Sequence, residues 1–317
     1  MSKAGNFPVN LVFLGTPVFA VPTLEAIVAA GHQVLAVFTQ PDRPKGRGGQ
    51  VTAPPVKETA LRLGLAVHQP ERVRGPEVVD QMKQLHPDAM VVVGYGQIIP
   101  QSIIDIPGFG IINVHGSLLP KYRGAAPIQW AIANGEKRTG VTTMRIDAGL
   151  DTGNMLLKWE TEIGPEENAL ELGQRLAAAG AGLLVRTLRE NPAPVKQDPA
   201  EATLAPILKK EDGLIDWNWP ARKIHNRVRG FLPWPGAYTF FRGQGFHIWK
   251  ARVAEQSGVA DPGRLWPVKK RLLIGCGEAT TLEAIEVQIE GRKRMPAEAF
   301  LNGHHLNENE TLGVRPN

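Results

Sequence analysis

The 317-residue sequence predicts an α/β domain followed by a smaller domain built mostly of β-strands. Three observations lead to this expectation. Short apolar runs alternate with helical patterns over the first 190 residues, residues 191–206 contain four prolines and few large apolar side chains, and short strand patterns with several tryptophans follow. Nearly continuous apolar strands separated by helices are typical of a mostly parallel sheet covered on both faces.

The strands of the first domain are expected at short, mainly apolar runs, namely residues 10–15, 33–39, 66–68, 89–94, 111–115 and 141–146. Helical patterns occur between or after them, at residues 22–30, 56–63, 76–85, 127–133 and 167–189. The first of these helices has Pro22 at its start and Gly31 just past its end, which are the usual signals that begin and end a helix. We expect the long last helix to close the domain.

The second domain is expected to be a small β-barrel. Residues 191–206 show no periodicity and predict an interdomain linker. One helix is expected at residues 221–228, followed by strands at 237–241, 246–251, 271–274 and 281–287. Short strands at turn-rich spacing favour a barrel of the oligonucleotide-binding (OB) type. The expected boundaries are therefore residues 1–190, a linker at 191–206, and residues 207–317.

The composition indicates a folded protein of the cytoplasm. Hydrophobic residues make up 43% and charged residues 21% of the chain, which suits packed cores. The apolar runs are far shorter than the roughly 20 residues that span a bilayer, and the polar first residues show no signal peptide. The single cysteine, Cys276, excludes an internal disulfide and is expected to be a buried small residue in a reducing compartment.

The net charge of +5 lies in the C-terminal third. Residues 205–317 contain 17 Lys and Arg against 12 Asp and Glu, whereas 19 of each cancel over residues 1–204. Positive charge gathered in one region favours a nucleic-acid partner. On charge alone, a solvated surface without a partner explains the excess equally well.

The most informative segment for chemistry runs from residue 113 to 124, N-V-H-G-S-L-L-P-K-Y-R-G. Asn113 and His115 are two apart at the end of a predicted strand, so their side chains point to the same face. An amide beside an imidazole suits acyl transfer, in which an oxygen becomes negative while the attacking amine loses a proton. The alternative is a strand-end Asn that caps a turn and a hydrogen-bonded buried His.

A carboxylate for this pair is available after the next predicted strand. The segment D-A-G-L-D-T-G contains Asp147 and Asp151, although Asp and Gly at such spacing often mark only a turn. There is no G-x-G-x-x-G, no Walker A sequence, and no His or Cys spacing typical of a zinc site. We therefore expect no metal, and we expect His304 and His305 to be surface residues.

Together the two segments, N-x-H-x-S-L-L-P-x-x-R-G followed by D-x-G-x-D-T-G, resemble the folate-dependent formyltransferases. This resemblance implies a Rossmann-like N-terminal domain and 10-formyltetrahydrofolate as the formyl donor. It also implies catalytic roles for Asn113, His115 and Asp151. The folate site implied by the resemblance includes four residues of the loop after the catalytic strand: Ser117, Leu118, Leu119 and Pro120.

Four further motifs narrow the resemblance to the branch of the family that formylates methionine on initiator tRNA. These are L-G-T-P-x-F-A-V-P from residue 14, P-D-R-P-x-G-R-G from 41, R-G-A-A-P-I-Q from 123 and L-P-W-P-G-A-Y from 232. The partner implied is initiator methionyl-tRNA, and the chain is expected to act as a monomer away from membranes.

Two groups of basic residues are expected to bind the tRNA. Arg43, Lys45 and Arg47 lie in the Gly- and Pro-rich connection at residues 41–54, and loops of this length in compact domains are often functional. Lys209 and Lys210 follow the linker. Four cations of the next helix could continue a phosphate-binding track: Arg222, Lys223, Arg227 and Arg229.

Three alternatives remain open. A formyltransferase that acts on a small amine or a nucleotide sugar would share Asn113, His115 and Asp151 but would not need the basic loop. An enzyme that hydrolyses 10-formyltetrahydrofolate would use water as the acceptor. A tRNA-binding module with an inactive α/β half would have no use for the three polar side chains.

Overall fold

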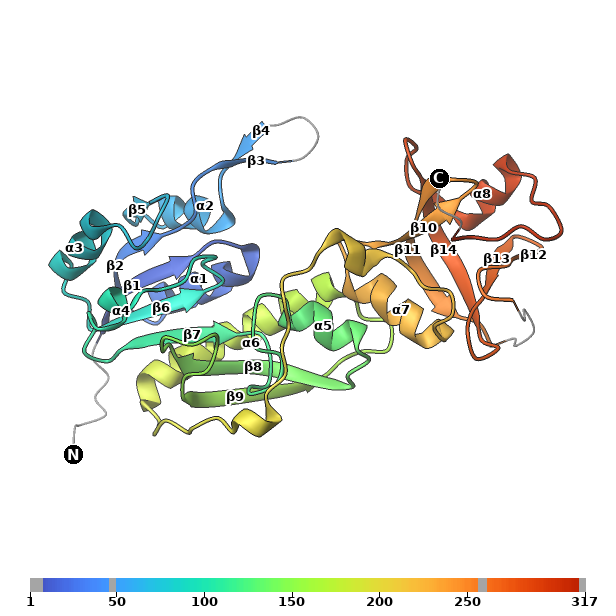
Figure 1. Cartoon of the computed structure of the whole chain (residues 1–317). Coiled ribbons are helices and arrows are strands. Elements are labelled where there is room, and N and C mark those ends of the chain that lie inside the picture. The colour runs from blue at the N-terminus through green and yellow to red at the C-terminus, as the bar shows by residue number, and fades with distance from the viewer. Residues whose placement is uncertain (1–7, 46–49, 256–260, 314–317) are drawn as a thin grey trace. The chain divides into compact units, whose positions relative to one another are not determined.

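The computed structural model describes residues 8–45, 50–255 and 261–313 (Figure 1). The chain forms two compact units. The N-terminal unit contains Met1–Pro127, Arg138–Glu162 and Gly173–Pro206. The C-terminal unit contains Ile128–Lys137, Ile163–Leu172 and Ile207–Asn317. None of the described helices is long and apolar enough to cross a membrane.

The N-terminal unit is built on a seven-stranded sheet with the order β5-β2-β1-β6-β7-β8-β9. Its strands are β1 (Asn10–Gly15), β2 (Gln33–Phe38), β5 (Val67–His68), β6 (Ala89–Val93), β7 (Ile111–His115), β8 (Arg138–Arg145) and β9 (Met155–Glu162). The first five pair in parallel, whereas β8 and β9 are antiparallel. The strand order reverses at β1, which lies between β2 and β6, as in Rossmann-like sheets. The mostly parallel sheet predicted from the sequence is confirmed.

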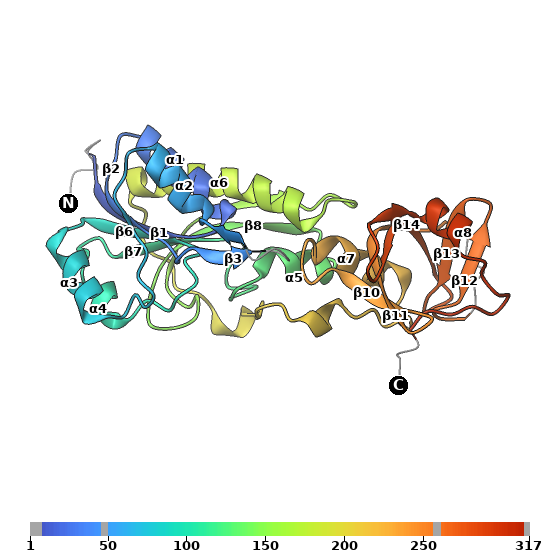
Figure 2. The ribbon, with the colours of Figure 1, turned by 90° about the horizontal axis from the view of Figure 1, so that it is seen from above.

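Helices cover both faces of this sheet. They are α1 (Val21–Ala29), α2 (Pro55–Arg62), α3 (Pro76–Gln84), α4 (Gln101–Ile104) and α6 (Ala169–Glu190), with short 3-10 helices η1 (Val18–Ala20) and η2 (Pro199–Glu201). Figure 2 shows α1, α2 and α6 on one face and α3 and α4 on the other. Because β1 is covered on both sides, consecutive residues from Leu11 to Leu14 are all fully buried.

Local sequence explains the helix ends. Helices α2 and α3 begin at Pro55 and Pro76, where the missing N–H of proline costs no intrahelical hydrogen bond. Gly31 and Gly64 follow α1 and α2 with φ of 81° and 71°, a left-handed conformation that glycine adopts without steric cost.

Besides the 3-10 helices, three features of the described part of this unit were not predicted from the sequence. A short hairpin of β3 (Arg43–Lys45) and β4 (Gln50–Thr52) lies within the expected loop. Helix α4 has a single turn, too short to give a periodic pattern. Strand β9 lies at the edge of the sheet, where, after two buried residues, half-buried residues alternate with exposed charged ones. An edge strand has water on one side, so it lacks the continuous apolar run used to find the other strands.

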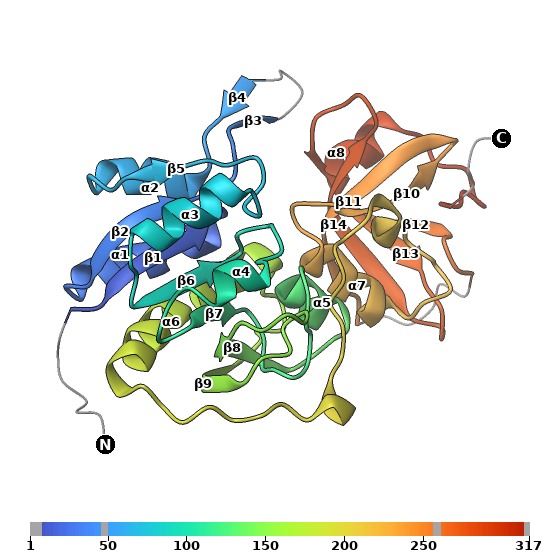
Figure 3. The same cartoon turned by 60° about the vertical axis from the view of Figure 1, so that its left-hand side comes forward.

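The C-terminal unit contains an antiparallel sheet with the order β10-β11-β14-β13-β12, and β15 pairs with β14 (Figure 3). Its strands are β10 (Ala237–Phe241), β11 (Gln244–Val253), β12 (Leu265–Val268), β13 (Arg271–Gly275), β14 (Thr281–Ile289) and β15 (Met295–Pro296). Its helices are α5 (Pro127–Ala133), η3 (Lys210–Gly213), α7 (Ala221–Gly230) and α8 (Ala297–Gly303). Its core includes Ile224 of α7, Phe246 of β11 and Phe300 of α8.

The chain beyond α8 links the two edges of this sheet. Leu265 at the β12 edge donates to Glu310, Leu312 donates to Gly263, and Gly313 donates to Phe240 of β10. These bonds bring residues 310–313 beside both edge strands, which is how a small sheet of the expected barrel type limits its open edges. Cys276 is buried, as expected, and burial raises the pKa of its thiol to about 12.

Candidate active site

Strand β7 places Asn113 and His115 side by side. It runs between β6 and β8, with Asn113 opposite Val92 and Met144 and His115 opposite Thr142. Asn113 is half-buried, and His115 is 6% exposed. Because the two residues are two apart on one strand, their side chains leave the same face, as the sequence predicted.

The loop between β8 and β9 brings a carboxylate to this pair. Asp151 Oδ1 lies 3.5 Å from Asn113 Nδ2, a long contact, and Asp151 Oδ2 lies 3.6 Å from His115 Nδ1. Asp151 Oδ2 also accepts a 2.8 Å hydrogen bond from the N–H of Gly124. The structure therefore brings together the three side chains that the sequence selected.

Asp147, the other carboxylate of the same loop, has a different role. It is exposed, and its Oδ1 accepts from the N–H of Gly149 at 3.1 Å and from the hydroxyl of Thr152 at 2.7 Å. Such contacts to residues two and five positions ahead shape a local turn. Asp147 thus stabilises the loop, and Asp151 alone of the two reaches Asn113 and His115.

The partners of His115 lie on both sides of its ring. Its Nε2 lies 2.9 Å from the carbonyl oxygen of Tyr122, and a carbonyl can only accept, so Nε2 carries a proton. Its Nδ1 faces the carboxylate of Asp151, which also accepts. Both ring nitrogens therefore face hydrogen-bond acceptors, and the acceptor beside Nδ1 is the negatively charged carboxylate.

The loop after β7 holds itself in place with its own polar groups. The hydroxyl of Ser117 donates to the carbonyl of Lys121 at 2.6 Å, and Leu119 N–H donates to the Thr142 hydroxyl at 3.1 Å. The peptide bond between Leu119 and Pro120 is cis, and both residues are buried. Leu118 is half-buried and packs close to Gly140 of β8. These four residues line the end of the strand that carries Asn113 and His115.

Hydrogen bonds connect the loops that follow β1, β2 and β6, at the point where the strand order reverses. The carbonyl of Tyr95 accepts from Thr16 Oγ1 at 2.9 Å and from Gln40 Nε2 at 3.1 Å. Val18 and Ile98, which also follow β1 and β6, are 70% and 90% exposed. Ligands of open α/β sheets bind at this edge. The sequence did not single out these residues, because their proximity depends on strand order.

The sequence also missed the contacts that residues 191–206 make with the site. Gln197 Nε2 donates to the carbonyls of Asp151 and Gly153, and its Oε1 accepts from Arg123. The Thr203 hydroxyl accepts from the N–H of Tyr122 at 2.9 Å. This segment belongs to the N-terminal unit. A lone glutamine among prolines gives no pattern from which such a role could be predicted.

The candidate RNA-contacting residues have different surroundings. Arg43 in β3 and Lys209 and Lys210 at the start of η3 are exposed. Lys45 ends β3, and Arg47 lies outside the described residues.

Two cations of the proposed phosphate track differ from the rest in burial. Arg229 is 8% exposed and donates to the carbonyls of Gly164 and Glu167 and to Asn226. Arg227 is half-buried against the Trp219 ring. Because the buried Arg229 is bound to these carbonyls, the part of the predicted track that depends on it is wrong. Arg222 and Lys223 are exposed.

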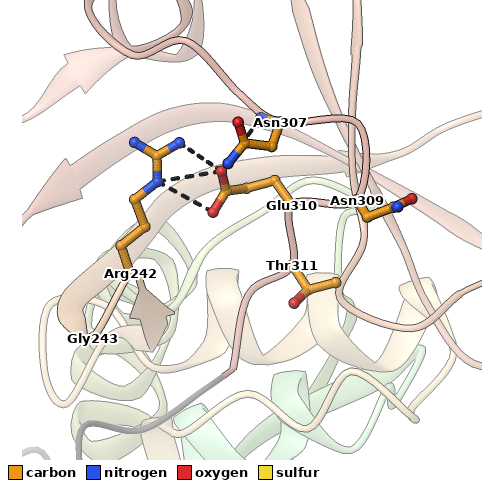
Figure 4. Close-up of a pocket in the computed structure, with 6 residues that line it drawn as sticks. All are labelled: Arg242, Gly243, Asn307, Asn309, Glu310 and Thr311. Carbon is orange, nitrogen blue, oxygen red and sulfur yellow. Dashed lines mark hydrogen bonds and ion pairs between the residues drawn. The ribbon is translucent and has the colours of Figure 1, made fainter.

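A shallow hollow of about 490 Å³ lies on the C-terminal unit, between the β10–β11 turn and the chain around Glu310 (Figure 4). Arg242 Nη2 donates to Glu310 Oε2 at 2.6 Å and to the carbonyl of His305 at 2.8 Å. These charged groups satisfy one another and hold residues 305–310 against the β10–β11 turn. We assign this hollow a structural role.

Both parts of the chain are similar to known proteins. Residues 9–188 match the family model described as formyl transferase, and residues 207–305 match its C-terminal domain. A methionyl-tRNA formyltransferase of Solibacter usitatus (strain Ellin6076) is 65% identical over 308 residues, covering 96% of this chain and 98% of the relative.

Two solved structures share the fold at low identity. An N-formyltransferase of Helicobacter canadensis, in complex with folinic acid and dTDP-3-aminofucose, has a TM-score of 0.65 at 19% identity and covers 87% of this chain and 98% of its own. A methionyl-tRNA formyltransferase of Clostridium thermocellum has a TM-score of 0.54 at 18% identity and covers 80% of this chain and 97% of its own. From the family models and the near full-length relative, the chain belongs to the formyltransferase family, within its methionyl-tRNA formyltransferase branch.

Proposed function

We propose that the enzyme transfers the formyl group of 10-formyltetrahydrofolate to the α-amino group of methionine on initiator tRNA. The proposal rests on one observation: Asn113, His115 and Asp151 lie together at the carboxyl end of β7, in a chain that matches methionyl-tRNA formyltransferases along its length. An amide donor and an imidazole, each within 3.6 Å of one carboxylate, are the groups that acyl transfer to an amine requires.

In this reaction the methionine nitrogen bonds to the formyl carbon, and the bond from that carbon to N10 of the folate then breaks. Asn113 has an amide N–H to donate to the oxygen that becomes negative. Asp151 accepts the proton that the amine loses, directly or through water. His115 keeps its Nε2 proton on the Tyr122 carbonyl, and its Nδ1 lies 3.6 Å from Asp151 Oδ2, so Nδ1 can take up the proton that Asp151 accepted and return it to the departing N10.

The donor is expected to bind at the edge where β1, β6 and β7 end. The Ser117–Pro120 loop follows β7, and the exposed Val18 and Ile98 follow β1 and β6. Apolar side chains that remain in water at the edge of a parallel sheet offer contact for a flat heterocycle, and nearby backbone groups offer hydrogen bonds.

The tRNA is expected to contact the C-terminal unit through exposed charge and aromatic rings. On the outer side of β11, His247 stacks on Trp249 with ring centroids 5.4 Å apart, and the Arg294 guanidinium lies 3.5 Å from the Trp249 centroid. Lys209 and Lys210 are exposed in the same unit. Cations beside aromatic rings are typical of surfaces that bind the phosphates and unpaired bases of RNA.

One assay with several acceptors tests the proposal. The protein is incubated with 10-formyltetrahydrofolate and charged initiator tRNA, and formylmethionine is measured after the ester is hydrolysed. A nucleotide amino sugar and glycinamide ribonucleotide serve as alternative acceptors, and a mixture without acceptor detects hydrolysis of the donor. Formylation of a small amine, or donor hydrolysis, at a higher rate than formylation of methionyl-tRNA would contradict the assignment.

The location of the enzyme follows from its proposed substrates. Charged tRNA and reduced folate are both cytoplasmic, so we place the enzyme there, and we expect it to act as a monomer. Light scattering at micromolar concentration tests the second point, since a dimer would have twice the mass of the chain.

A further inference from the structure

The segment between the two matched domains carries a buried polar side chain where a linker would be solvated. Gln197 is only 4% exposed, whereas the apolar Val195 and Leu204 are 57% and 70% exposed. The usual preference is thus reversed, because an amide is buried while aliphatic side chains remain in water. A buried amide needs hydrogen-bond partners, so the partners of Gln197 indicate its role.

Both ends of this amide are paired. Nε2 donates to the carbonyl of Asp151 at 2.8 Å and to that of Gly153 at 2.7 Å. Oε1 accepts from Nε and Nη2 of Arg123 at 3.1 and 2.8 Å. A guanidinium can only donate, so Arg123 determines which end of the amide faces the Asp151 loop. Gln197 therefore holds the backbone of the residue that provides the carboxylate.

The loop that carries Asp151 needs such support. Asp151 has a φ of 51°, in the left-handed region that is unfavourable for a residue with a side chain. Two residues later, a Cβ at Gly153 would lie 1.9 Å from the carbonyl oxygen of Arg145. The turn is therefore both strained and closely packed, and the hydrogen bonds from Gln197 span it.

The same segment also holds the turn on the other side of the site. The backbone N–H of Arg123 donates to the carbonyl of Thr203 at 2.8 Å, and its carbonyl accepts from the N–H of Ala205 at 2.7 Å. The neighbours of Arg123 contact the trio directly, since Tyr122 accepts from His115 and Gly124 donates to Asp151. A Cβ at Gly124 would lie 2.6 Å from the carbonyl oxygen of Ala205, so only glycine allows this approach.

We propose that Gln197 is a positioning residue for formyl transfer and that residues 197–205 form part of the active site. Gln197 acts through Asp151, because it sets the position of the Asp151 backbone and, with Arg123, the turn whose N–H binds the Asp151 carboxylate. The inference rests on the proposed function, which places Asp151 in the path of the amine's proton.

The first test uses full-length Gln197→Glu. This substitution keeps the shape but replaces the donating Nε2 by an oxygen that faces two carbonyls. We expect kcat to fall at least about tenfold, since small misplacement of a reacting group is costly, while KM for both substrates changes less than about twofold. Lys196→Ala is the matched control, because Lys196 is the exposed neighbour of Gln197. The control should keep kcat, KM and melting temperature.

The second test asks whether Gln197 acts through Asp151. In an Asp151→Asn background, Gln197→Glu should lower the residual kcat less than about twofold, because residues that act as a unit are not additive. A purely structural role predicts instead that Gln197→Glu lowers the melting temperature and that the kcat losses of the two single variants multiply in the double variant. Multiplying losses, or unchanged kcat in folded Gln197→Glu, would overturn the inference.

A milder variant keeps the inference testable if Gln197→Glu does not fold. Thr203→Val removes only the hydroxyl that accepts from the Tyr122 N–H, and it should lower kcat about threefold with the same dependence on Asp151. An unchanged kcat in this variant would count against the role of residues 197–205. If the unsubstituted chain makes no formylmethionine, the proposed function fails first, so the two failures are distinct.

Discussion

The candidate functional residues of the two units differ in burial. In the N-terminal unit, His115, Arg123 and Gln197 are buried, and each is paired at a defined distance. In the C-terminal unit the candidate contacts Lys209 and Lys210 are exposed, and the same unit carries a patch of stacked rings. Chemistry requires fixed geometry, whereas attraction for a polyanion is a sum over many charges. Single substitutions should therefore have large effects at the buried site of the first unit and small effects at the exposed cations.

The largest effect is a loss of turnover, which we expect when a candidate catalytic residue is replaced. Asn113→Ala, His115→Ala and Asp151→Asn should each lower kcat at least about 10²-fold, the usual loss for an oxyanion donor or a proton-transfer group. Folding and tRNA affinity should stay close to those of the unsubstituted protein. Turnover and melting curves check this prediction, and near-normal turnover in all three folded variants would remove the proposed mechanism.

The second largest effect is expected on the affinity for the folate donor. Leu118→Asp places a charge in the half-buried loop that follows β7 and should weaken binding of a folate analogue about tenfold or more, since an unpaired charge is poorly tolerated beside apolar surface. Leu118→Met, of similar volume, is the control. Titration with the analogue and with tRNA separates the two ligands. Equal folate affinity in folded Leu118→Asp would show that this loop does not contribute to the donor site.

Smaller, additive effects are expected for the exposed cations. Arg43→Ala, Lys209→Ala and Lys210→Ala should each reduce tRNA affinity by about three- to tenfold and reduce the slope of log K against log salt by about one unit, if each contacts one phosphate. The exposed Arg138, which pairs with Glu160 in the N-terminal unit, provides a control through Arg138→Ala. Binding measured over a range of salt tests the comparison, and a salt slope unaffected by all three substitutions would contradict it.

The smallest effect is a pH dependence of stability in the C-terminal unit. Burial lowers the pKa of His247, as do the nearby Arg294 and Lys210, while Glu290 opposes them. As the pH falls below about 6.5, the unfolded chain binds a proton before the folded one does, so the His247 contribution to stability is present above that pH and is lost on acidification. His247→Gln should reduce the loss of melting temperature between pH 7.5 and 5.5. The same acid sensitivity in the variant would show that other groups cause it.

Much of the N-terminal fold follows from local sequence. Apolar runs located the parallel strands, and proline and glycine marked helix ends such as Pro76 and Gly31. The placement of Asn113 and His115 on one face followed from their spacing on a strand. The family motifs identified the third member, Asp151. These features could be predicted because each depends on residues close together in the chain.

Tertiary structure alone decided how Asp151 reaches the site. Strand β8 is antiparallel to β7, so Arg145 at its end lies opposite Ile112, near the start of β7. The loop that follows must return toward His115, and its left-handed turn at Asp151 is held by Gln197 from a segment 46 residues later. Strand direction and such distant contacts leave no periodic pattern in the sequence.

Burial in the C-terminal unit was also decided by tertiary structure. Sequence composition placed Arg229 among the basic residues of one helix, but the fold turns it inward to bind the carbonyls of Gly164 and Glu167. Likewise, residues 310–313 have no strand-like pattern, yet they pair with both edges of the sheet. Charge and composition determine that a basic region exists, but which cations face water depends on where the backbone carbonyls of distant segments lie.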